Sequence, residues 1–182
     1  MSKHDRLTRR EDCVLVIIDA QEKLLPVIHD QDAVVANIAK LAKFAGIAGL
    51  PVVVTEQMKL GATVADVALA NLEAPALSKI SFDCFGCEDF AARIKDLKRK
   101  TLVLCGVEAH ICVFQTALTA LEDFRVQVVS DAVGSRAPHN WLVALERLRQ
   151  AGCVITSTEM FIYEILRQAG TEEFKATLPL VK

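Results

Sequence analysis

Short runs of apolar residues recur along the chain and predict buried β-strands. The first run, 13–18, is apolar at every position and ends at Asp19. A run without polar interruptions implies burial on both faces of a sheet, as in the middle of a parallel sheet. Further strands are predicted at 51–55, 101–105, 125–129 and 153–156, with a short sixth strand at 77–80.

The segments between these strands carry the periodicity of helices. In 33–49, Val34, Ile38 and Leu41 recur at helical spacing, and Gly49 stands where the helix would end. Helical patterns also cover 88–98, 112–123 and 140–151. Strands that alternate with helices predict βαβ units with right-handed crossovers. We therefore expect one α/β domain spanning 1–182, with a mostly parallel sheet between helical layers.

Two stretches are less clearly patterned. The pattern weakens across 56–77, where we expect a short helix and a loop near the edge of the sheet. The C-terminal stretch 159–180 contains an apolar group, and the pattern leaves open whether that group covers the core or faces a second subunit.

Composition and charge restrict the class of partner. The chain has 21 basic and 23 acidic residues and a net charge of −2, whereas binding to nucleic acid needs a basic patch or stripe. The cluster formed by Lys95 and 98–100 is interpreted as the solvated end of a helix. We therefore expect a small-molecule substrate and no nucleic-acid partner.

The N-terminal segment, the lengths of the apolar runs and the placing of the cysteines predict a cytoplasmic location. Residues 1–12 are polar and lack the apolar core of a secretory signal, and no apolar run reaches the length of about 18 residues that a membrane span needs. Three of the six cysteines, Cys13, Cys105 and Cys153, lie in or beside apolar runs, where reduced core thiols are expected.

Ligands of an open parallel sheet bind outside the carboxyl ends of the strands. Asp19 follows the first predicted strand directly, Lys79 ends a short apolar stretch, and 106–112 connects a strand to a helix. Cys112 would stand in the first turn of that helix, where the dipole and free N–H groups favour a thiolate and can stabilise an oxyanion. A nearby lysine would also favour the thiolate, while a carboxylate would oppose it and could serve as general base. The resting form of Cys112 stays open at this stage.

Three separated motifs occur in the order found in one enzyme family. The chain resembles the isochorismatase-like cysteine hydrolases. The resemblance is carried by Val16-Ile-Ile-Asp-Ala-Gln21, Ser78-Lys79 and Gly106-Val-Glu-Ala-His-Ile-Cys-Val113, and it continues through 130–136 and 152–159. The segment Thr55-Glu56-Gln57, after the second predicted strand, resembles the branch of this family related to isochorismatase domain-containing proteins. The resemblance covers nearly the whole chain. It implies a three-layer α/β/α fold whose six strands have the order 3-2-1-4-5-6, and it suggests a homo-oligomer.

The resemblance also implies roles for individual residues. Cys112 would be the nucleophile, Asp19 the general base, and Lys79 the group that orients and stabilises charge. The backbone N–H groups of Glu108 and Cys112 would form the oxyanion hole, beside a cis peptide bond between Val107 and Glu108. Five other side chains are candidates to line the substrate pocket: Gln21, Glu56, Gln57, Phe82 and His110.

The sequence departs from the family pattern in two places. His110 stands where many members have an aspartate, and a dyad with Cys112 is disfavoured because positions i and i+2 of a helix do not face each other. The metal-dependent nicotinamidases carry a histidine in the segment that here reads Thr55-Glu56-Gln57, so we expect no metal and no cofactor. The pair Cys84 and Cys87 is a lone C-x-x-C without further ligands and predicts neither a zinc site nor a redox motif.

The leading functional hypothesis is hydrolysis of a small amide or related acyl compound through a thioester on Cys112. A second hypothesis is cleavage of the vinyl ether of isochorismate, which needs no thiol nucleophile. A third is a catalytically idle binding or scaffold protein on the same fold. The sequence does not name the substrate.

Overall fold

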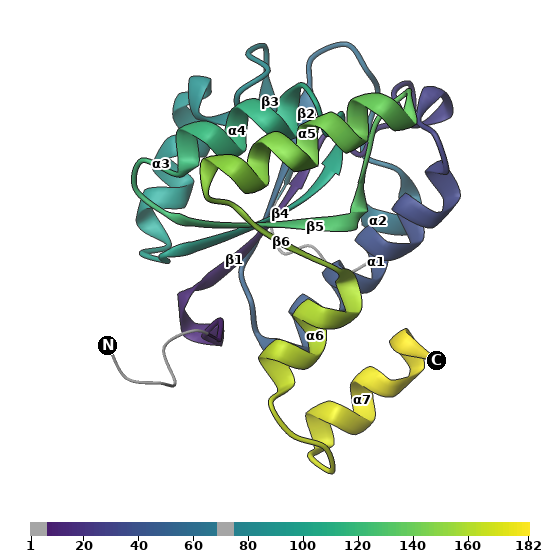
Figure 1. The fold of residues 1–182 in the computed structure, drawn as a ribbon, viewed down its shortest axis with the longest axis vertical. Coiled ribbons are helices and arrows are strands. Elements are labelled where there is room, and N and C mark those ends of the chain that lie inside the picture. Colours follow the sequence, from purple (N-terminus) through teal and green to yellow (C-terminus); the bar gives the residue numbers. More distant parts are fainter. Residues whose placement is uncertain (1–6, 69–74) are drawn as a thin grey trace.

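One parallel sheet organises the molecule. The computed structural model describes residues 7–68 and 75–182, and within them six strands pair in the order β3-β2-β1-β4-β5-β6 (Figure 1). Every pair of neighbouring strands is parallel. The predicted α/β fold and its strand order are confirmed. The strands are β1 (Cys13–Ile18), β2 (Val52–Gln57), β3 (Leu77–Lys79), β4 (Thr101–Val107), β5 (Arg125–Gly134) and β6 (Val154–Thr156).

Helices cover both faces of the sheet. Figure 1 shows α4 and α5 on one side of the strands and α6 and α7 on the other. The helices are α1 (Gln31–Ala48), α2 (Ala65–Ala68), α3 (Glu88–Asp96), α4 (Cys112–Ala120), α5 (Pro138–Ala151), α6 (Thr158–Leu166) and α7 (Glu172–Val181). Three single turns of 3₁₀ helix are η1 (Arg10–Asp12), η2 (Leu25–Val27) and η3 (Cys84–Gly86).

Alternate residues of each strand supply two separate cores. Leu15 and Ile17 of β1 face the cluster that α1 and α6 complete, while Val14 and Val16 face the cluster beneath α3, α4 and α5. All six residues of β1 are buried. This two-sided burial explains why the strand is apolar at every position, since successive side chains of a strand point to opposite faces.

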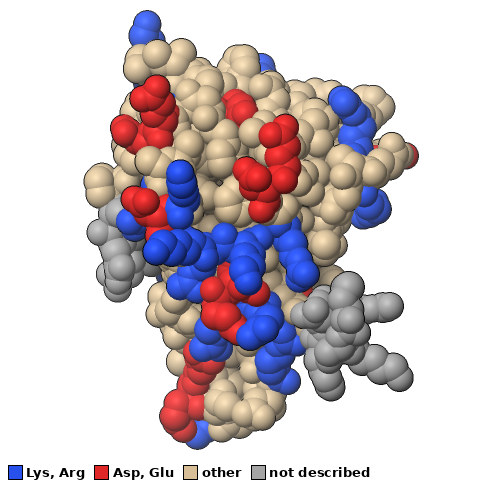
Figure 2. All heavy atoms as spheres, turned by 90° about the vertical axis from the view of Figure 1, so that its left-hand side faces the viewer, with Lys and Arg blue, Asp and Glu red and all other residues tan. Residues whose placement is uncertain are grey.

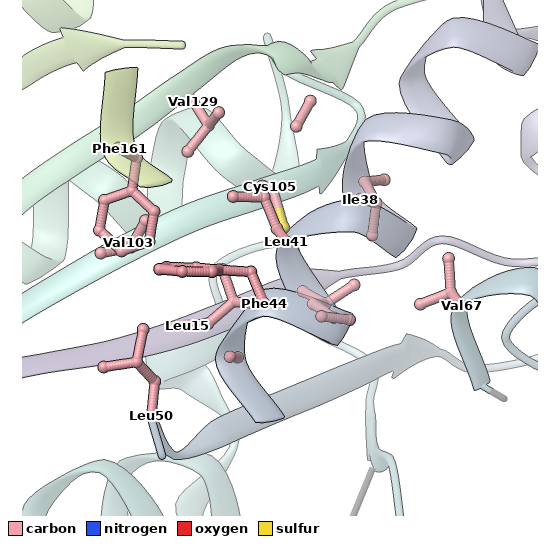
Figure 3. Packing of buried hydrophobic residues seen from close by; sticks show 14 of the residues in the cluster. Leu15, Ile38, Leu41, Phe44, Leu50, Val67, Val103, Cys105, Val129 and Phe161 are labelled. Atoms are coloured by element: carbon pink, nitrogen blue, oxygen red, sulfur yellow. The ribbon is translucent and has the colours of Figure 1, made fainter. Parts of the chain in front are cut away.

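The helix α6 packs into the first of these cores. Figure 3 shows Phe161 of α6 and Phe44 of α1 beside Leu15 and Val103 of the sheet. The two rings meet edge to face, with centroids 6.3 Å apart. Phe161, together with Ile162, Ile165 and Leu166, therefore covers the core, and Met160 is the exposed member of the C-terminal apolar group.

Several elements extend beyond the predicted bounds. The strand β2 continues through Glu56 and Gln57, and β5 continues to Gly134 after a register shift against β4. These extensions contain polar residues that no apolar pattern would reveal. In the weakly patterned stretch 56–77 the structure shows the short helix α2, while 69–74 lies outside the described residues.

Candidate active site

Asp19 and Lys79 form an ion pair at the carboxyl edge of the sheet. Asp19 follows β1 with a left-handed φ of 53°, a conformation that aspartate adopts more readily than most residues. Lys79 is the last residue of β3. The Lys79 Nζ lies 2.7 Å from Oδ2 of Asp19, and both side chains are completely buried. The pair therefore lies in an environment of low dielectric, where its partners depend on each other.

The ammonium group of Lys79 is surrounded by acceptors. Besides Asp19, it donates to Oε1 of Gln57 at 2.8 Å and to the carbonyl oxygen of Ser81 at 3.2 Å. Burial by itself lowers the pKa of Lys79, but the attraction and hydrogen bond of Asp19 outweigh burial and raise this pKa above its usual value. Lys79 is therefore a permanent cation at physiological pH.

The second carboxylate oxygen of Asp19 is held by Thr55. The Thr55 hydroxyl donates to Oδ1 at 2.9 Å, and the Asp19 N–H donates to the Thr55 carbonyl at 3.1 Å. Thr55 is fully buried and pairs in register with Ile18, one residue before Asp19. The orientation of the carboxylate is thus set by two neighbours on different strands.

Cys112 begins α4 and is almost entirely buried. Burial, followed by the charge of Asp19, raises the pKa of its thiol to about 12, and the charge of Lys79 opposes this rise. The geometry therefore favours a neutral thiol at rest, although the helix terminus alone would favour the thiolate. The proximity of Asp19 gives the thiol proton an acceptor when substrate arrives.

Two backbone N–H groups lie just before and at the start of α4. Among the described residues, the N–H groups of Glu108 and Cys112 donate no hydrogen bond to the protein. The peptide bond between Val107 and Glu108 is cis, at the position that the family resemblance implies. Free N–H groups at the start of a helix are suited to a developing negative charge.

The side chain of Glu108 is enclosed by a polar cluster at the same edge. Its carboxylate accepts from Nε of Arg136 at 2.5 Å and lies 3.4 Å from Nδ1 of His110. His110 also contacts the Ser135 hydroxyl at 3.0 Å and the amide of Asn140 at 3.3 Å. His110 is therefore held within this cluster.

Two of the candidate pocket residues, Gln21 and Glu56, form hydrogen bonds with the loop that follows β2. The amide of Gln21 is fully buried, accepts from the N–H of Gln57 at 2.8 Å and donates to the carbonyl of Gly61 at 2.6 Å. Glu56 accepts from the N–H and hydroxyl groups of Thr63 at 2.7 and 2.8 Å. Through these hydrogen bonds both side chains hold the loop after β2 against the end of that strand.

Sequence reasoning missed three members of the site. No site role was predicted for Thr55, which was noted as the end of a strand and in the Thr55-Glu56-Gln57 motif, or for Thr116, which lies in a predicted helix. Cys84, half of the C-x-x-C, is fully buried and donates its backbone N–H to the Thr116 hydroxyl at 3.0 Å. Its thiol lies 3.8 Å from the Thr55 hydroxyl. The signals available for Thr55 were its place at the end of the apolar run 51–55 and in the Thr55-Glu56-Gln57 motif.

No group of three metal-binding side chains is found within 7–68 and 75–182. In the part of the chain that the structure describes, no helix is both long and apolar enough to cross a bilayer.

Basic residues gather on a different part of the surface. Figure 2 shows Lys and Arg side chains across the middle of one face, around a few acidic side chains. Arg10 and Lys100 directly precede the amino ends of β1 and β4 and pair with Glu173 and Asp12. Asp19 follows the carboxyl end of β1, so Arg10 and Lys100 lie at the opposite end of the parallel sheet from the candidate active site.

Comparison with known proteins assigns the family. The model of the isochorismatase domain matches residues 13–160. This chain belongs to the isochorismatase family. A secreted isochorismatase effector, Isc1, from Phytophthora sojae is 36% identical over 93% of this chain and 84% of its own length.

Solved structures of the family superpose closely. The MAR1 ribonuclease from Caenorhabditis elegans is 30% identical with a TM-score of 0.90, covering 96% of this chain and 92% of that one. YcaC from Pseudomonas aeruginosa, solved with hexane-2,5-diol and covalent acrylamide, is 27% identical with a TM-score of 0.90, covering 98% and 93%. YcaC from Escherichia coli, described as an octameric hydrolase of unknown specificity, is 26% identical with a TM-score of 0.86, covering 92% and 85%.

Proposed function

We propose that this family member is a cysteine hydrolase that cleaves a small amide or related acyl compound. The observation that carries the proposal is the convergence of three side chains from separate strands and a helix. Lys79 contacts Asp19 at 2.7 Å, and Asp19 lies close enough to Cys112 for its charge to raise the pKa of the thiol. Nucleophile, base and orienting cation thus form one connected unit, the arrangement that nucleophilic catalysis requires.

The first half of the reaction forms a thioester. As the sulfur of Cys112 attacks the substrate carbonyl carbon, the thiol proton passes to Asp19, and the carbonyl oxygen becomes an oxyanion. The N–H groups of Glu108 and Cys112 receive this charge. Collapse of the intermediate breaks the C–N bond, and the leaving amine takes the proton from Asp19.

The second half releases the acid. Asp19 takes a proton from water as the water attacks the thioester, and the returning proton restores the Cys112 thiol. Lys79 keeps Asp19 oriented and charged through both halves because its ammonium remains within hydrogen-bond distance of Oδ2. Gln57, Phe82 and His110 are the remaining candidates for contact with substrate.

The Pseudomonas aeruginosa protein supports a reactive group in this fold, because its structure contains covalent acrylamide. Acrylamide is an electrophile that thiols attack, and an amide of similar size to the proposed substrates.

A second candidate function is ribonuclease activity, which is the activity named for the Caenorhabditis elegans structure. The 30% identity between that protein and this chain favours it. Cleavage of RNA needs cations free to bind phosphate beside the reacting atoms. Lys79 is buried and bonded to Asp19, and Arg10 and Lys100 lie at the amino ends of the strands, so we rank ribonuclease activity below amide hydrolysis.

The test measures ammonia release from a panel of small amides. Wild type is expected to hydrolyse at least one amide, and Cys112→Ala, Asp19→Asn and Lys79→Met are expected to lose at least 10³-fold in kcat, of the order seen when a nucleophile or its base is removed. Cys105→Ala, which removes a buried thiol on the other face of the sheet, serves as the matched control and should keep full activity.

Two results would contradict the proposal. Activity that survives in Cys112→Ala would favour vinyl-ether cleavage or another reaction without a thiol nucleophile. A folded wild type that is inert toward the panel and toward thiol alkylation at Cys112 would favour the binding or scaffold protein.

We further propose a homo-oligomeric protein of the cytoplasm. The octamer described for the Escherichia coli protein supports self-association, and all six cysteines are free thiols. The Phytophthora sojae relative is named as secreted, so fractionation of cells and medium is the appropriate measurement, with light scattering for the oligomer.

A further inference from the structure

The loop after β3 holds the Lys79 ammonium group by its backbone. This loop, residues 80–87, runs from the end of β3 through η3 to the start of α3. The Lys79 ammonium donates to the carbonyl of Ser81 at 3.2 Å and reaches the carbonyl of Phe82 at 3.4 Å. The position of the cation therefore depends on the position of the loop.

The same loop is bonded to α4, the helix that begins at Cys112. The Thr119 hydroxyl donates to Oδ2 of Asp83 at 2.8 Å. The N–H of Cys84 donates to the Thr116 hydroxyl at 3.0 Å. Thr116 and Thr119 stand at positions i+4 and i+7 from Cys112, so the three residues share one face of the helix. The loop thus lies along the face of α4 that carries the candidate nucleophile.

Asp83 joins the two sets of contacts. Its Oδ2 accepts from Thr119, and its Oδ1 accepts from the Phe85 N–H at 2.9 Å and caps η3. Its carbonyl oxygen accepts from the Ser81 hydroxyl at 2.7 Å. Both carboxylate oxygens are therefore engaged. One residue connects the segment that holds Lys79 to the helix α4.

We propose that Asp83 and Thr119 are positioning residues, which keep the Lys79 ammonium at a fixed distance from the sulfur of Cys112. The inference rests on the proposed function, and both residues act through Lys79. A shift of the loop relative to α4 moves the cation relative to the thiol and changes the electrostatic potential at the sulfur. In the folded protein Lys79 is close enough for its charge to lower the pKa of the Cys112 thiol against the effect of burial.

The test compares the labelling of Cys112 by iodoacetate and by iodoacetamide. Both reagents react with the same thiolate and differ by one charge, so the ratio of the two rates cancels ionisation and access and reports the potential at the sulfur. The intact protein is labelled at pH 9, and peptide mass gives each rate at Cys112. Each rate is then divided by that of a free thiol with the same reagent.

Thr119→Val keeps the shape of the side chain and removes only the hydroxyl. We expect the ratio of iodoacetate to iodoacetamide labelling to fall about threefold, the effect of a modest change in Coulomb energy. Thr119→Ser should restore the wild-type ratio. With an amide that the wild type hydrolyses, Thr119→Val should lower kcat and leave KM nearly unchanged.

A bond of the same kind on the other face of the sheet supplies the control. The Thr158 hydroxyl donates to Oδ1 of Asp131 at 3.0 Å and joins α6 to β5. Thr158→Val therefore loses one hydroxyl bond to an aspartate, as Thr119→Val does. Urea denaturation checks that both variants are folded. The labelling ratio of Thr158→Val should equal that of wild type.

Asp83→Ala tests the connection from the other side. It removes the acceptor of the Thr119 hydroxyl, so the ratio should fall at least as far as in Thr119→Val. The double variant Asp83→Ala/Thr119→Val should fall no further than Asp83→Ala, because the two residues act through one bond.

Three results overturn the inference. They are a wild-type ratio in Thr119→Val, a fall of equal size in Thr158→Val, and additive losses in the double variant. Failure of the wild type to hydrolyse any amide would refute the proposed function alone, because the labelling ratios are measured without turnover.

Discussion

The Nζ atom of Lys79 lies 2.7 Å from Oδ2 of Asp19, and neither side chain has any exposed surface. The two residues end strands that are not neighbours, because β2 lies between β1 and β3. The Lys79 side chain crosses the end of β2 and donates to Gln57 there. Breaking this pair should therefore affect both stability and chemistry.

Removing the cation should be costly. Lys79→Met leaves the Asp19 carboxylate buried and without its charged partner, and we expect the free energy of unfolding to fall by about 3–5 kcal/mol. Urea denaturation measures this change. The double variant Asp19→Asn/Lys79→Met should lose less than the two single variants together, since it leaves no unpaired charge. Strict additivity would contradict the coupling.

The hydroxyl of Thr55 should matter for rate more than for binding. Thr55→Val keeps the shape of the side chain and removes the hydrogen bond to Asp19, a bond to a charged group of about 1.5–3 kcal/mol. We expect kcat to fall about tenfold or more with little change in KM, and Thr55→Ser to restore it. A loss confined to KM would show that Thr55 does not act through Asp19.

Gly106 should tolerate no side chain. Its φ is 118°, and an added Cβ would lie 2.0 Å from the carbonyl oxygen of Ile18. Gly106→Ala is therefore expected to destabilise the protein by more than 4 kcal/mol or to prevent folding, because two central strands would have to separate. Thermal unfolding provides the measurement. The control Gly46→Ala places a methyl group in open space on α1 and should stabilise by about 0.5–1 kcal/mol.

Alkaline pH should destabilise the protein. Burial raises the pKa of Cys13, Cys84 and Cys112 to about 12 and that of Cys153 to about 11. Above pH 9 the unfolded chain releases these protons while the folded chain keeps them, so stability falls as pH rises. Each thiol contributes at most about 1.4 kcal/mol per pH unit.

Deprotonation of Lys79 also lowers the stability of the folded protein, at a higher pH than the thiols. Its pKa is raised in the folded protein, so the stabilisation by its charge is complete below the unfolded pKa and is lost as pH rises through the folded pKa. Urea titrations from pH 7 to 10.5 check the effect of the thiols, and their extension above pH 10.5 checks the effect of Lys79. Cys153→Ala should make the decline above pH 9 shallower, and an identical slope would argue against a buried Cys153 thiol.

The apolar runs alone were sufficient to predict five of the six strands and the fold class, because burial on both faces of β1 and β4 forces every position to be apolar. The short strand β3 was also expected. Resemblance to the family supplied Asp19, Lys79 and Cys112 as candidates. Their spacing in the sequence could not place them together, since Lys79 reaches Asp19 only across the end of β2.

The sequence by itself determined the α/β fold and the candidate residues at the carboxyl edge, because alternation of apolar strands and helices is a local property of the chain. Only the tertiary structure decided the roles of Thr55 and Cys84 and the resting form of Cys112. Those properties depend on which groups from distant segments cover a thiol or a carboxylate. Burial and the charge of Asp19 raise the pKa of Cys112 to about 12, against the opposing influence of Lys79 and of the helix N-terminus.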